Sequence, residues 1–406
     1  MYQSVFAIKG NGVPWVWGRN DSGQLGTGNL TSYSSPVAMI GSHSFSILFP
    51  SITTAMGVHF DQDAWACGGN TGGELGTGNT TSYSSPVAVV GNHLFVFVNT
   101  DGDAGAGHSF GLKSSGAAWA WGTNTFGQLG SGDMVSYSSP VAVVGSHSFR
   151  QIYSAGNNAF SIALKSDGSA WAWGSNDSGQ LGTGNATSYS SPVAVIGNHS
   201  FIKICTGRFT TSSAWGLKSN GSIWGWGANS VGQLGNGTVT SYSSPIAVVG
   251  SHSFIDFAVG FSHVIGLKAD GSVWGWGSDS AGQLGDNTLT TVSSPVAMIG
   301  GHSFNQIMAG ARISFGLKAN GEIWACGFND FGQLGHNDNI TYSSPVLVVG
   351  SHSFTQLATN QNIRCYVDDA AVWHRGNIGY VNLGSSWGRV TEAWVNVGGT
   401  TWNKWA

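Results

Sequence analysis

Histidine is the first candidate for chemistry in this 406-residue chain, because it recurs in the string Gly-x-His-x-Phe. Neutral imidazole is a common metal ligand, and a set of equivalent histidines could in principle form a ring of ligands. Equivalent positions of successive repeats are far apart unless they line a central channel. We therefore interpret each histidine as a side chain that caps a turn between two strands, and we predict no metal site. The seven positions are His43, His93, His147, His199, His252, His302 and His352.

Tyrosine and aspartate recur in the same way. In the string Tyr-Ser-Ser-Pro, Val292 once replaces the tyrosine, which otherwise stands at Tyr33, Tyr83, Tyr137, Tyr189, Tyr242 and Tyr342. We interpret the tyrosine side chains as residues that pack between repeats. The alternative is that they are exposed and stack on sugars. Asn-Asp-x-Gly loops contain Asp21, Asp177 and Asp330, but they lack the closely spaced carboxylates of a dedicated calcium loop. Turn capping is the better interpretation of these aspartates.

Catalytic motifs are missing from the sequence. There is no Gly-x-Ser-x-Gly elbow, no phosphate-binding glycine loop before a helix and no zinc-protease motif. The cysteines Cys67, Cys205, Cys326 and Cys365 form no Cys-x-x-Cys pair, so neither a zinc site nor a disulfide is predicted. Cys67 and Cys326 replace the second tryptophan of a Trp-x-Trp-Gly string and are expected to be buried there. We predict that the protein is not an enzyme and carries no cofactor.

The elements that position these residues come from a repeat of 50 to 54 residues. In the fourth repeat, residues 161–165 and 169–173 alternate as strands around the turn 166–168, since Asp-Gly and Asn-Gly favour tight hairpins. An outer strand follows Pro192, and residues 201–204 begin the next repeat. Four antiparallel strands per repeat, seven times over, predict an all-β seven-bladed propeller. The first tryptophans of the repeats are Trp15, Trp65, Trp119, Trp171, Trp224, Trp274 and Trp324.

The combined motif resembles the repeat of the regulator-of-chromosome-condensation family. In the fourth repeat it reads Ala-Gly, then Leu-Lys-Ser-Asp-Gly, Trp-Ala-Trp-Gly, Gly-Gln-Leu-Gly and Pro192. The resemblance covers about residues 5 to 357 and implies a seven-bladed propeller, whereas it says little about function. Relatives that exchange nucleotide on a small GTPase use long insertions. The uniform repeats here argue against that activity.

The phase of the repeat predicts how the propeller closes. The chain starts at the strand 4–9 without the inner strand that precedes it in other repeats, and residues 354–358 form an inner strand without a complete repeat after it. We expect residues 354–358 to complete the sheet begun by residues 4–17, which removes two free sheet edges. The predicted domains are residues 1–360, the propeller, and residues 361–406, a tryptophan-rich β extension.

Variable loops are the places to look for binding, because a rigid scaffold presents them while its own residues repeat. The repeats differ most in the loop between the first two strands, just before Gly-Gln-Leu-Gly, and after that string. Arginine and aromatic residues are favoured anchors of interfaces. The predicted ligand- or partner-binding residues are therefore Arg208, Phe209, Arg312, Phe126 and Phe331, with neutral drift of the loops as the alternative.

The last residues form a second candidate region. A hairpin is predicted around Gly398 and Gly399, and the string Trp-Val-Asn-Val-Gly-Gly-Thr-Thr-Trp resembles a short module at the ends of tailed-phage virion proteins. Exposed tryptophans commonly mark an interface. We predict that an attachment element is formed by Trp387, Trp394, Trp402 and Trp405.

Composition narrows the function classes. Charged residues make up 8% of the chain, its net charge is −4, and it has no basic cluster, so a nucleic-acid partner is disfavoured. Neither a signal peptide nor a membrane-spanning run is found. The favoured hypothesis is a non-enzymatic bacteriophage virion protein of the tail, fibre or particle surface. Such a protein would bind host glycan or other virion proteins, and a homo-oligomer is compatible with this role. The alternative is a cytoplasmic cellular scaffold that binds a protein partner. A polysaccharide hydrolase or lyase is a third hypothesis.

Overall fold

The computed structural model describes residues 4–8, 12–101, 107–155, 159–207, 212–330, 332–349, 354–357, 366–367, 373–382, 387–396 and 402–404. Within these ranges the regular elements are β-strands, and no helix is long and apolar enough to cross a membrane. The chain forms two compact units. The first contains residues 1–177 and 185–199, and the second contains residues 178–184 and 200–406.

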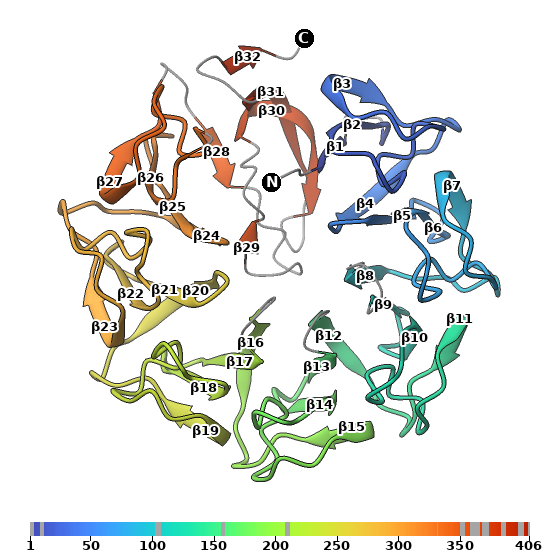
Figure 1. The fold of residues 1–406 in the computed structure, drawn as a ribbon, viewed down its shortest axis with the longest axis horizontal. Helices are drawn as coiled ribbons and strands as arrows, with labels where there is room; N and C mark the ends of the chain where they lie inside the picture. Colours follow the sequence, from blue (N-terminus) through green and yellow to red (C-terminus); the bar gives the residue numbers. More distant parts are fainter. Residues whose placement is uncertain are drawn as a thin grey trace. The chain divides into compact units, whose positions relative to one another are not determined.

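The first unit contains four sheets of consecutive antiparallel strands (Figure 1). The first sheet has three strands, β1 to β3, and the second, third and fourth sheets have four each, β4 to β7, β8 to β11 and β12 to β15. The strands are β1 (Ser4–Ile8), β2 (Pro14–Gly18), β3 (Tyr33–Ala38), β4 (Phe45–Pro50), β5 (Thr54–His59), β6 (Ala64–Gly68), β7 (Tyr83–Ala88), β8 (Phe97–Asp101), β9 (His108–Leu112), β10 (Ala118–Gly122), β11 (Tyr137–Ala142), β12 (Phe149–Ala155), β13 (Phe160–Lys165), β14 (Ala170–Gly174) and β15 (Tyr189–Ala194).

The second unit continues the pattern with the fifth, sixth and seventh sheets. These are β16 to β19, β20 to β23, and β24 to β27 with β29 added beside β24, while β28 and β30 to β32 form an eighth sheet. The strands are β16 (Phe201–Thr206), β17 (Ser213–Lys218), β18 (Ile223–Gly227), β19 (Tyr242–Ala247), β20 (Phe254–Val259), β21 (His263–Lys268), β22 (Val273–Gly277), β23 (Val292–Ala297), β24 (Gln306–Gly310), β25 (Ile313–Leu317), β26 (Ile323–Gly327), β27 (Tyr342–Leu347), β28 (Phe354–Leu357), β29 (Tyr366–Val367), β30 (Trp373–Asn382), β31 (Trp387–Asn396) and β32 (Trp402–Lys404).

Each repeated sheet has two distinct ends. At the turn end, the second and third strands join through a tight turn such as that at Gly168, whose φ of +84° suits a residue without a side chain. At the loop end, the glycine of Trp-x-Trp-Gly pairs with the start of the outer strand, as Gly174 pairs with Tyr189. The pairing is irregular just before that glycine, because Ala172 and Gly174 are two residues apart while their partners Val193 and Tyr189 are four residues apart. A β-bulge therefore ends the pairing and begins the polar loop.

Neighbouring sheets within a unit are joined by the second tryptophan of several repeats. Trp173 is fully buried and its indole Nε1 donates to the Gln128 carbonyl of the preceding sheet at 2.8 Å, and Trp276 donates to the Gln233 carbonyl at 3.0 Å. Cys326 occupies the same position in the seventh sheet and is likewise buried, with its Sγ 3.6 Å from the Gln283 carbonyl. The sequence prediction that this cysteine is a small buried substitute is confirmed.

Two sequence predictions need correction. Residues 354–357 do form a strand, β28, but it pairs with β30, with Leu357 opposite Trp373. This pairing replaces the predicted one with residues 4–17, since joining strands close in sequence closes a much shorter loop. Cys205 is disulfide-bonded, although no disulfide was predicted, because sequence spacing does not report which cysteines the fold brings within bonding distance.

The C-terminal hairpin prediction is confirmed at the level of the backbone. β31 pairs antiparallel with β32, with Asn396 opposite Trp402 on either side of Gly398 and Gly399. The predicted division at residue 360 stays a prediction.

Candidate functional site

The loop end of the seventh sheet brings variable segments together. Ile313 pairs with Gly327, so the β24–β25 loop and the segment that follows β26 lie at the same end of this sheet. The tight turn at Gly321 lies at the other end, where its backbone N–H donates to the Lys318 carbonyl. The two loop types that vary most between repeats therefore share one end of a sheet.

Arg312 lies exposed at this loop end. Its Nη2 donates to Ser280 Oγ of the sixth sheet at 3.0 Å, and its guanidinium lies 5.3 Å from the centroid of the Phe328 ring. A serine and an aromatic ring thus hold the guanidinium between two sheets of one unit, where it remains accessible. Planar, fixed and exposed guanidinium groups bind carboxylates well.

The other predicted site residues have different outcomes. Phe126 is 45% exposed at the loop end of the third sheet, where its backbone N–H donates to Gln128 Oε1 at 2.9 Å. Trp387 and Trp394 lie on β31 and Trp402 on β32, and their attachment role stays a prediction. Arg208, Phe209, Phe331 and Trp405 lie outside the described residues.

A buried asparagine, which was not predicted from the sequence, organises the loop that carries these residues. In the fifth sheet Asn229 Oδ1 accepts the Leu234 N–H at 2.9 Å, and its Nδ2 donates to the carbonyls of Thr238 and Thr240 at 3.0 and 2.9 Å. The signal was present, since six of the seven repeats have asparagine two positions after the glycine of Trp-x-Trp-Gly or Trp-x-Cys-Gly. Equivalent fully buried residues are Asn20, Asn70, Asn124, Asn176 and Asn329.

Two loops carry an acid where their sister repeats carry an amide. Asp279 replaces the buried asparagine in the sixth sheet, and Glu74 replaces the glutamine of Gly-Gln-Leu-Gly in the second. Glu74 is 1% exposed and its Oε2 accepts the Gly72 N–H at 2.7 Å. Burial penalises the charged carboxylate, and it raises the pKa of Glu74 to about 6 and the pKa of Asp279 to about 7.

The repeated histidines lie at the turn end and are structural. His147 packs against Trp171 with ring centroids 4.2 Å apart and the ring planes tilted, and Lys165 Nζ lies 4.2 Å from the centroid of the same indole. The imidazole also lies against Gly145, at which a Cβ would come within 2.6 Å of Nε2. Burial, with Lys165 nearby, lowers the pKa of His147. Nowhere in the described ranges do three or more histidine, cysteine, aspartate or glutamate side chains gather as a metal would require.

The repeated tyrosines are held by their own loops. Tyr137 donates its hydroxyl hydrogen to Asp133 Oδ2 at 2.7 Å, and Tyr342 donates to Asp338 Oδ2 at 2.8 Å. Both tyrosines are partly buried. These contacts support a structural role for the tyrosines.

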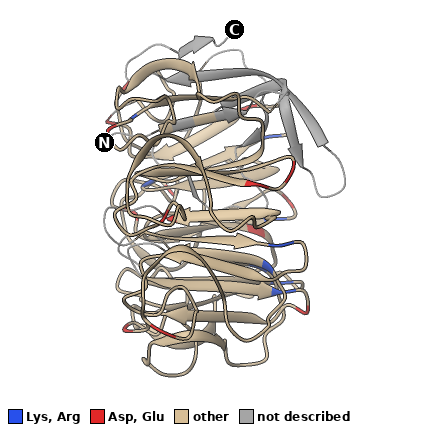
Figure 2. Ribbon diagram, turned by 90° about the vertical axis from the view of Figure 1, so that its right-hand side faces the viewer, with Lys and Arg blue, Asp and Glu red and all other residues tan. Residues whose placement is uncertain are grey.

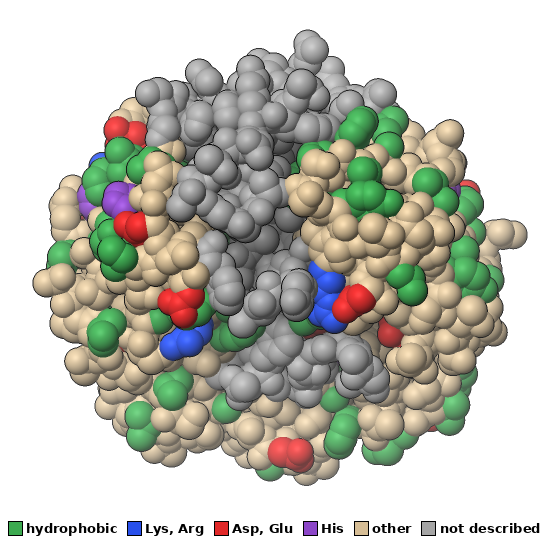
Figure 3. All heavy atoms as spheres, turned by 45° about the horizontal axis from the view of Figure 1, so that its top comes forward, with side chains coloured by type: hydrophobic (Ala, Val, Ile, Leu, Met, Phe, Trp, Pro, Cys, Tyr) green, Lys and Arg blue, Asp and Glu red, His purple; other side chains and the backbone are tan. Residues whose placement is uncertain are grey.

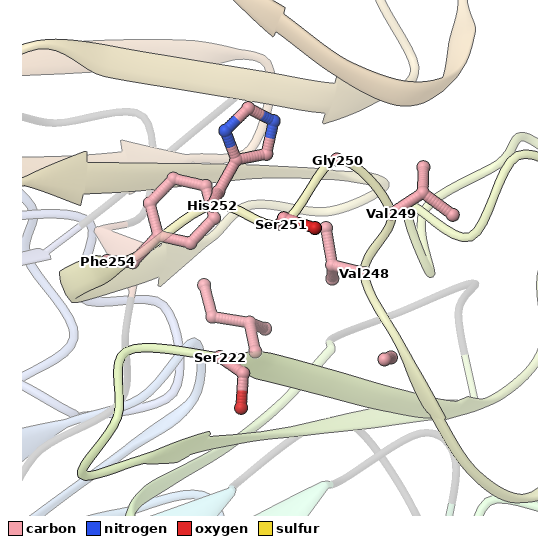
Figure 4. A pocket seen from close by; sticks show the side chains of 9 residues that line it. Ser222, Val248, Val249, Gly250, Ser251, His252 and Phe254 are labelled. Carbon is pink, nitrogen blue, oxygen red and sulfur yellow. The ribbon is translucent and has the colours of Figure 1, made fainter.

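A pocket of about 340 Å³ lies at the turn end of the fifth sheet (Figure 4). His252 is its single titratable side chain, and valine, isoleucine and phenylalanine supply much of the lining. Acid–base catalysis needs a second positioned group, so this pocket gives no support to a catalytic function. It is lined by Ser222, Ile223, Ala247, Val248, Val249, Gly250, Ser251, His252 and Phe254.

Charge is sparse over the described surface. The ribbon in Figure 2 is mostly uncharged, and its few basic and acidic residues are scattered along it. In the space-filling view of Figure 3, the apolar side chains also appear as separate spots among uncharged polar atoms. A phosphate backbone would need a concentrated basic surface, so these views agree with the low charge of the sequence.

Comparison with protein-family models identifies the repeat. The model "Regulator of chromosome condensation (RCC1) repeat" matches residues 11–57, 115–164, 167–213, 220–267, 270–317 and 320–362, and a second RCC1-repeat model matches residues 90–128, 151–180, 254–283 and 304–333. Together these matches cover well over half of the chain.

Curated relatives share only a part of their length with this chain. A stretch of 168 residues, 40% of this chain, is 29% identical to the human E3 ubiquitin-protein ligase HERC2, of which it covers 3%. A stretch of 150 residues, 36% of the chain, is 33% identical to the human probable E3 ubiquitin-protein ligase HERC4, of which it covers 14%. The chain thus matches a small fraction of these ligases.

Solved structures with the same fold include human WBSCR16, with a TM-score of 0.67 and 20% identity over 85% of this chain and 96% of that one. Yeast RCC1 (Prp20), solved bound to Kap60, has a TM-score of 0.64 and 18% identity over 86% of both chains. Another structure of Prp20p from Saccharomyces cerevisiae, described with its binding to Gsp1p and histones, also has a TM-score of 0.64. The fold is an RCC1-like seven-bladed β-propeller, as the sequence predicted.

Proposed function

Because this chain belongs to the RCC1-repeat family, we propose that it is a non-enzymatic propeller scaffold that binds a protein partner through the loop end containing Arg312. The observation that carries the proposal is the exposed guanidinium held by Ser280 and Phe328. Fixing a charged side chain in advance lowers the entropy lost on binding. A carboxylate on the partner is the complementary group.

The comparisons favour this hypothesis over the virion role. Prp20 is a relative in fold that was solved with, or described as binding, other proteins. The curated relatives named above are human proteins. Neither set supports binding to glycans or assembly into a virion, which stay predictions from the sequence alone.

A photo-crosslinking experiment tests the proposed surface in the full-length chain. A benzophenone amino acid at Leu289, an exposed residue of the β22–β23 loop, should crosslink to a discrete protein partner, which mass spectrometry then identifies. The same amino acid at Ser222, at the turn end of the fifth sheet, serves as the positional control. Equal crosslinking from both positions would contradict a partner site at the loop end.

Binding of the purified partner then tests Arg312 directly. We expect Arg312→Ala to weaken the Kd by about tenfold or more, the size typical of a charged interface anchor. Arg150→Ala is the matched control, since Arg150 is also exposed but lies at a turn end, where its Nε donates to the Lys165 carbonyl. An equal effect of the two variants would show non-specific charge attraction, and Arg312-dependent binding on a glycan array would favour the sugar alternative.

A further inference from the structure

The loops at the loop ends of the fifth and sixth sheets have the same length but different hydrogen-bonding groups. In the fifth, the amide of Asn229 donates to Asn236 Oδ1 at 3.1 Å as well as to two backbone carbonyls. In the sixth, Asp279 and Asp286 occupy the positions of Asn229 and Asn236. Two amides are thus replaced by two carboxyl groups on otherwise matching loops.

Only one oxygen of Asp279 has a short hydrogen bond. Its Oδ1 accepts the Leu284 N–H at 2.8 Å, as Asn229 Oδ1 accepts the Leu234 N–H. The Asp286 carboxyl group is a hydrogen-bonding neighbour of Asp279, in the position that Asn236 has beside Asn229. The Thr288 hydroxyl lies 3.5 Å from Asp279 Oδ2, a distance too long for a strong bond.

The hydrogen available from Thr288 is already used elsewhere. The Thr288 hydroxyl lies 2.9 Å from Asp286 Oδ1, which also accepts the Thr288 N–H at 2.9 Å. A hydroxyl has one hydrogen to donate, so it cannot satisfy both carboxylates. One donor is therefore missing between Asp279 Oδ2 and Asp286.

We propose that Asp279 holds a proton, which its carboxylic O–H donates toward the Asp286 carboxylate, and that this hydrogen bond closes the β22–β23 loop onto its own sheet as the amide of Asn229 closes the loop of the fifth sheet. The carboxylic O–H supplies the donor that the amide supplies in the sister repeat. When the proton leaves, the buried carboxylate of Asp279 faces the partly exposed carboxylate of Asp286, and the loop loses a hydrogen bond and gains a repulsion.

Burial and charge support this assignment. Asp279 is fully buried, and burial and then Asp286 raise its pKa to about 7, partly offset by the bond from the Leu284 N–H. Two further groups face this region: the buried Cys326 thiol, whose pKa is itself raised by burial, Asp279 and Asp286, and Arg312, which contacts Ser280 next to Asp279. The thiol is neutral at physiological pH, and the guanidinium is exposed to solvent.

The loop that the proton closes also contacts the next sheet. The Asn287 N–H donates to the Ser343 carbonyl of the seventh sheet at 2.8 Å, and Leu289 is 61% exposed at the tip. Losing the proton should therefore loosen the contact between the sixth and seventh sheets near Arg312. We call the proton-mediated hydrogen bond between Asp279 and Asp286 the latch. The latch is a property of the folded chain, and it does not depend on which partner the chain binds.

Thermal unfolding of the full chain as a function of pH tests the latch. A folded-state pKa raised above the unfolded value of 3.8 means that the stabilisation is complete below about pH 4 and is lost as the pH rises through about 7. We expect Asp279→Asn to raise the Tm at pH 8.5 by about 2–4 °C relative to wild type. At pH 5 we expect the two proteins to differ less.

The matched control transfers the pair to the fifth sheet. Asn229→Asp combined with Asn236→Asp, in the Asp279→Asn background, should restore a Tm that falls as the pH rises through neutrality. If Asp279→Asn kept the full pH dependence of the wild type while the transferred pair showed none, the proposal would be wrong.

Carbon-13 NMR with carboxyl-labelled aspartate gives a readout that does not depend on stability. The resonance that disappears in Asp279→Asn should titrate near neutrality in the wild type, and Asp286→Asn should lower its midpoint. If the chemical shift of this resonance showed that the Asp279 carboxyl group is already ionised at pH 5, the proposal would be overturned. So would a Ca²⁺-induced rise in Tm at pH 8.5 in the wild type but not in Asp279→Asn, because a cation would then occupy the place of the proton.

Discussion

The fifth and sixth loops compare an amide with an acid on the same backbone frame. Asn229 serves as donor and acceptor together, and its amide nitrogen has three acceptors within hydrogen-bond distance for its two hydrogens. Asp279 accepts the corresponding Leu284 N–H, but it needs a proton to donate. The two loops therefore share a backbone geometry, whereas the stability of the sixth loop is expected to depend on pH.

The largest expected effect comes from placing an unpartnered acid in the fifth loop. Asn229→Asp alone should lower the free energy of unfolding by about 3 kcal/mol at pH 8, since a buried charge would face the Thr238 and Thr240 carbonyls. The loss should be smaller at pH 5, where the new acid can hold a proton. Chemical denaturation at the two pH values measures both numbers.

Asn220→Asp is the control for this prediction. Asn220 is exposed in the turn of the same sheet, where Asp270 occupies the equivalent position in the sixth and accepts the Ser272 N–H in the same way. Its replacement should change the free energy of unfolding by less than about 0.5 kcal/mol. A similar loss in both variants would mean that added negative charge, rather than the buried loop, causes the effect.

An intermediate effect is expected at Glu74, the second site where an acid replaces an amide. Its pKa of about 6 lies above its ordinary value of 4.5, so its stabilisation is complete below pH 4.5 and is lost as the pH rises through about 6. Glu74→Gln should therefore stabilise the protein by about 1–2 kcal/mol at pH 8 and have little effect at pH 4. Denaturation curves at those pH values provide the measurement.

The reverse change tests the same comparison in the first sheet. Gln24 Nε2 donates to the Ile52 carbonyl at 3.1 Å, which an ionised glutamate could not do. Gln24→Glu should destabilise the protein at pH 8 and recover much of the loss at pH 4. A pH-independent loss would indicate altered packing instead.

The smallest expected effect concerns the tyrosine hydroxyls. Tyr137→Phe removes a hydrogen bond to the Asp133 carboxylate and should cost about 1 kcal/mol. Tyr242 is the matched position in the fifth sheet, where Thr238 replaces that aspartate and the described residues provide no side-chain acceptor. Tyr242→Phe should therefore change the free energy of unfolding by less than about 0.5 kcal/mol, and equal costs would contradict this role of Asp133.

The repeat alone was enough to predict the sheets. Alternating strands, Asp-Gly or Asn-Gly turns and a period near 50 residues are local signals, and they occur seven times with little change. The same repetition correctly assigned Cys326 to a buried position. The strand at residues 354–357 was also predicted, but its partner was not, because pairing depends on which distant segments the fold brings side by side.

The candidate site could be predicted only in part. Arg312 was recognisable as an arginine in a variable loop, whereas its contacts with Ser280 and Phe328 required the sixth and seventh sheets to be placed together. Asp279 and Glu74 were visible as departures from the repeat, but their significance depended on burial. Sequence patterns report a residue's type and position, and they do not report the atoms around a side chain.

The sequence by itself determined the all-β repeat, the turn positions and the family, because each rests on short-range patterns and backbone preferences. The tertiary structure decided which carbonyls face Asn229, which oxygen of Asp279 lacks a short hydrogen bond, and which loops share an end of a sheet. Hydrogen bonds and desolvation depend on atoms that are distant in the chain but close in space. For that reason the scaffold is readable from the residues, and the chemistry of its loops required the fold.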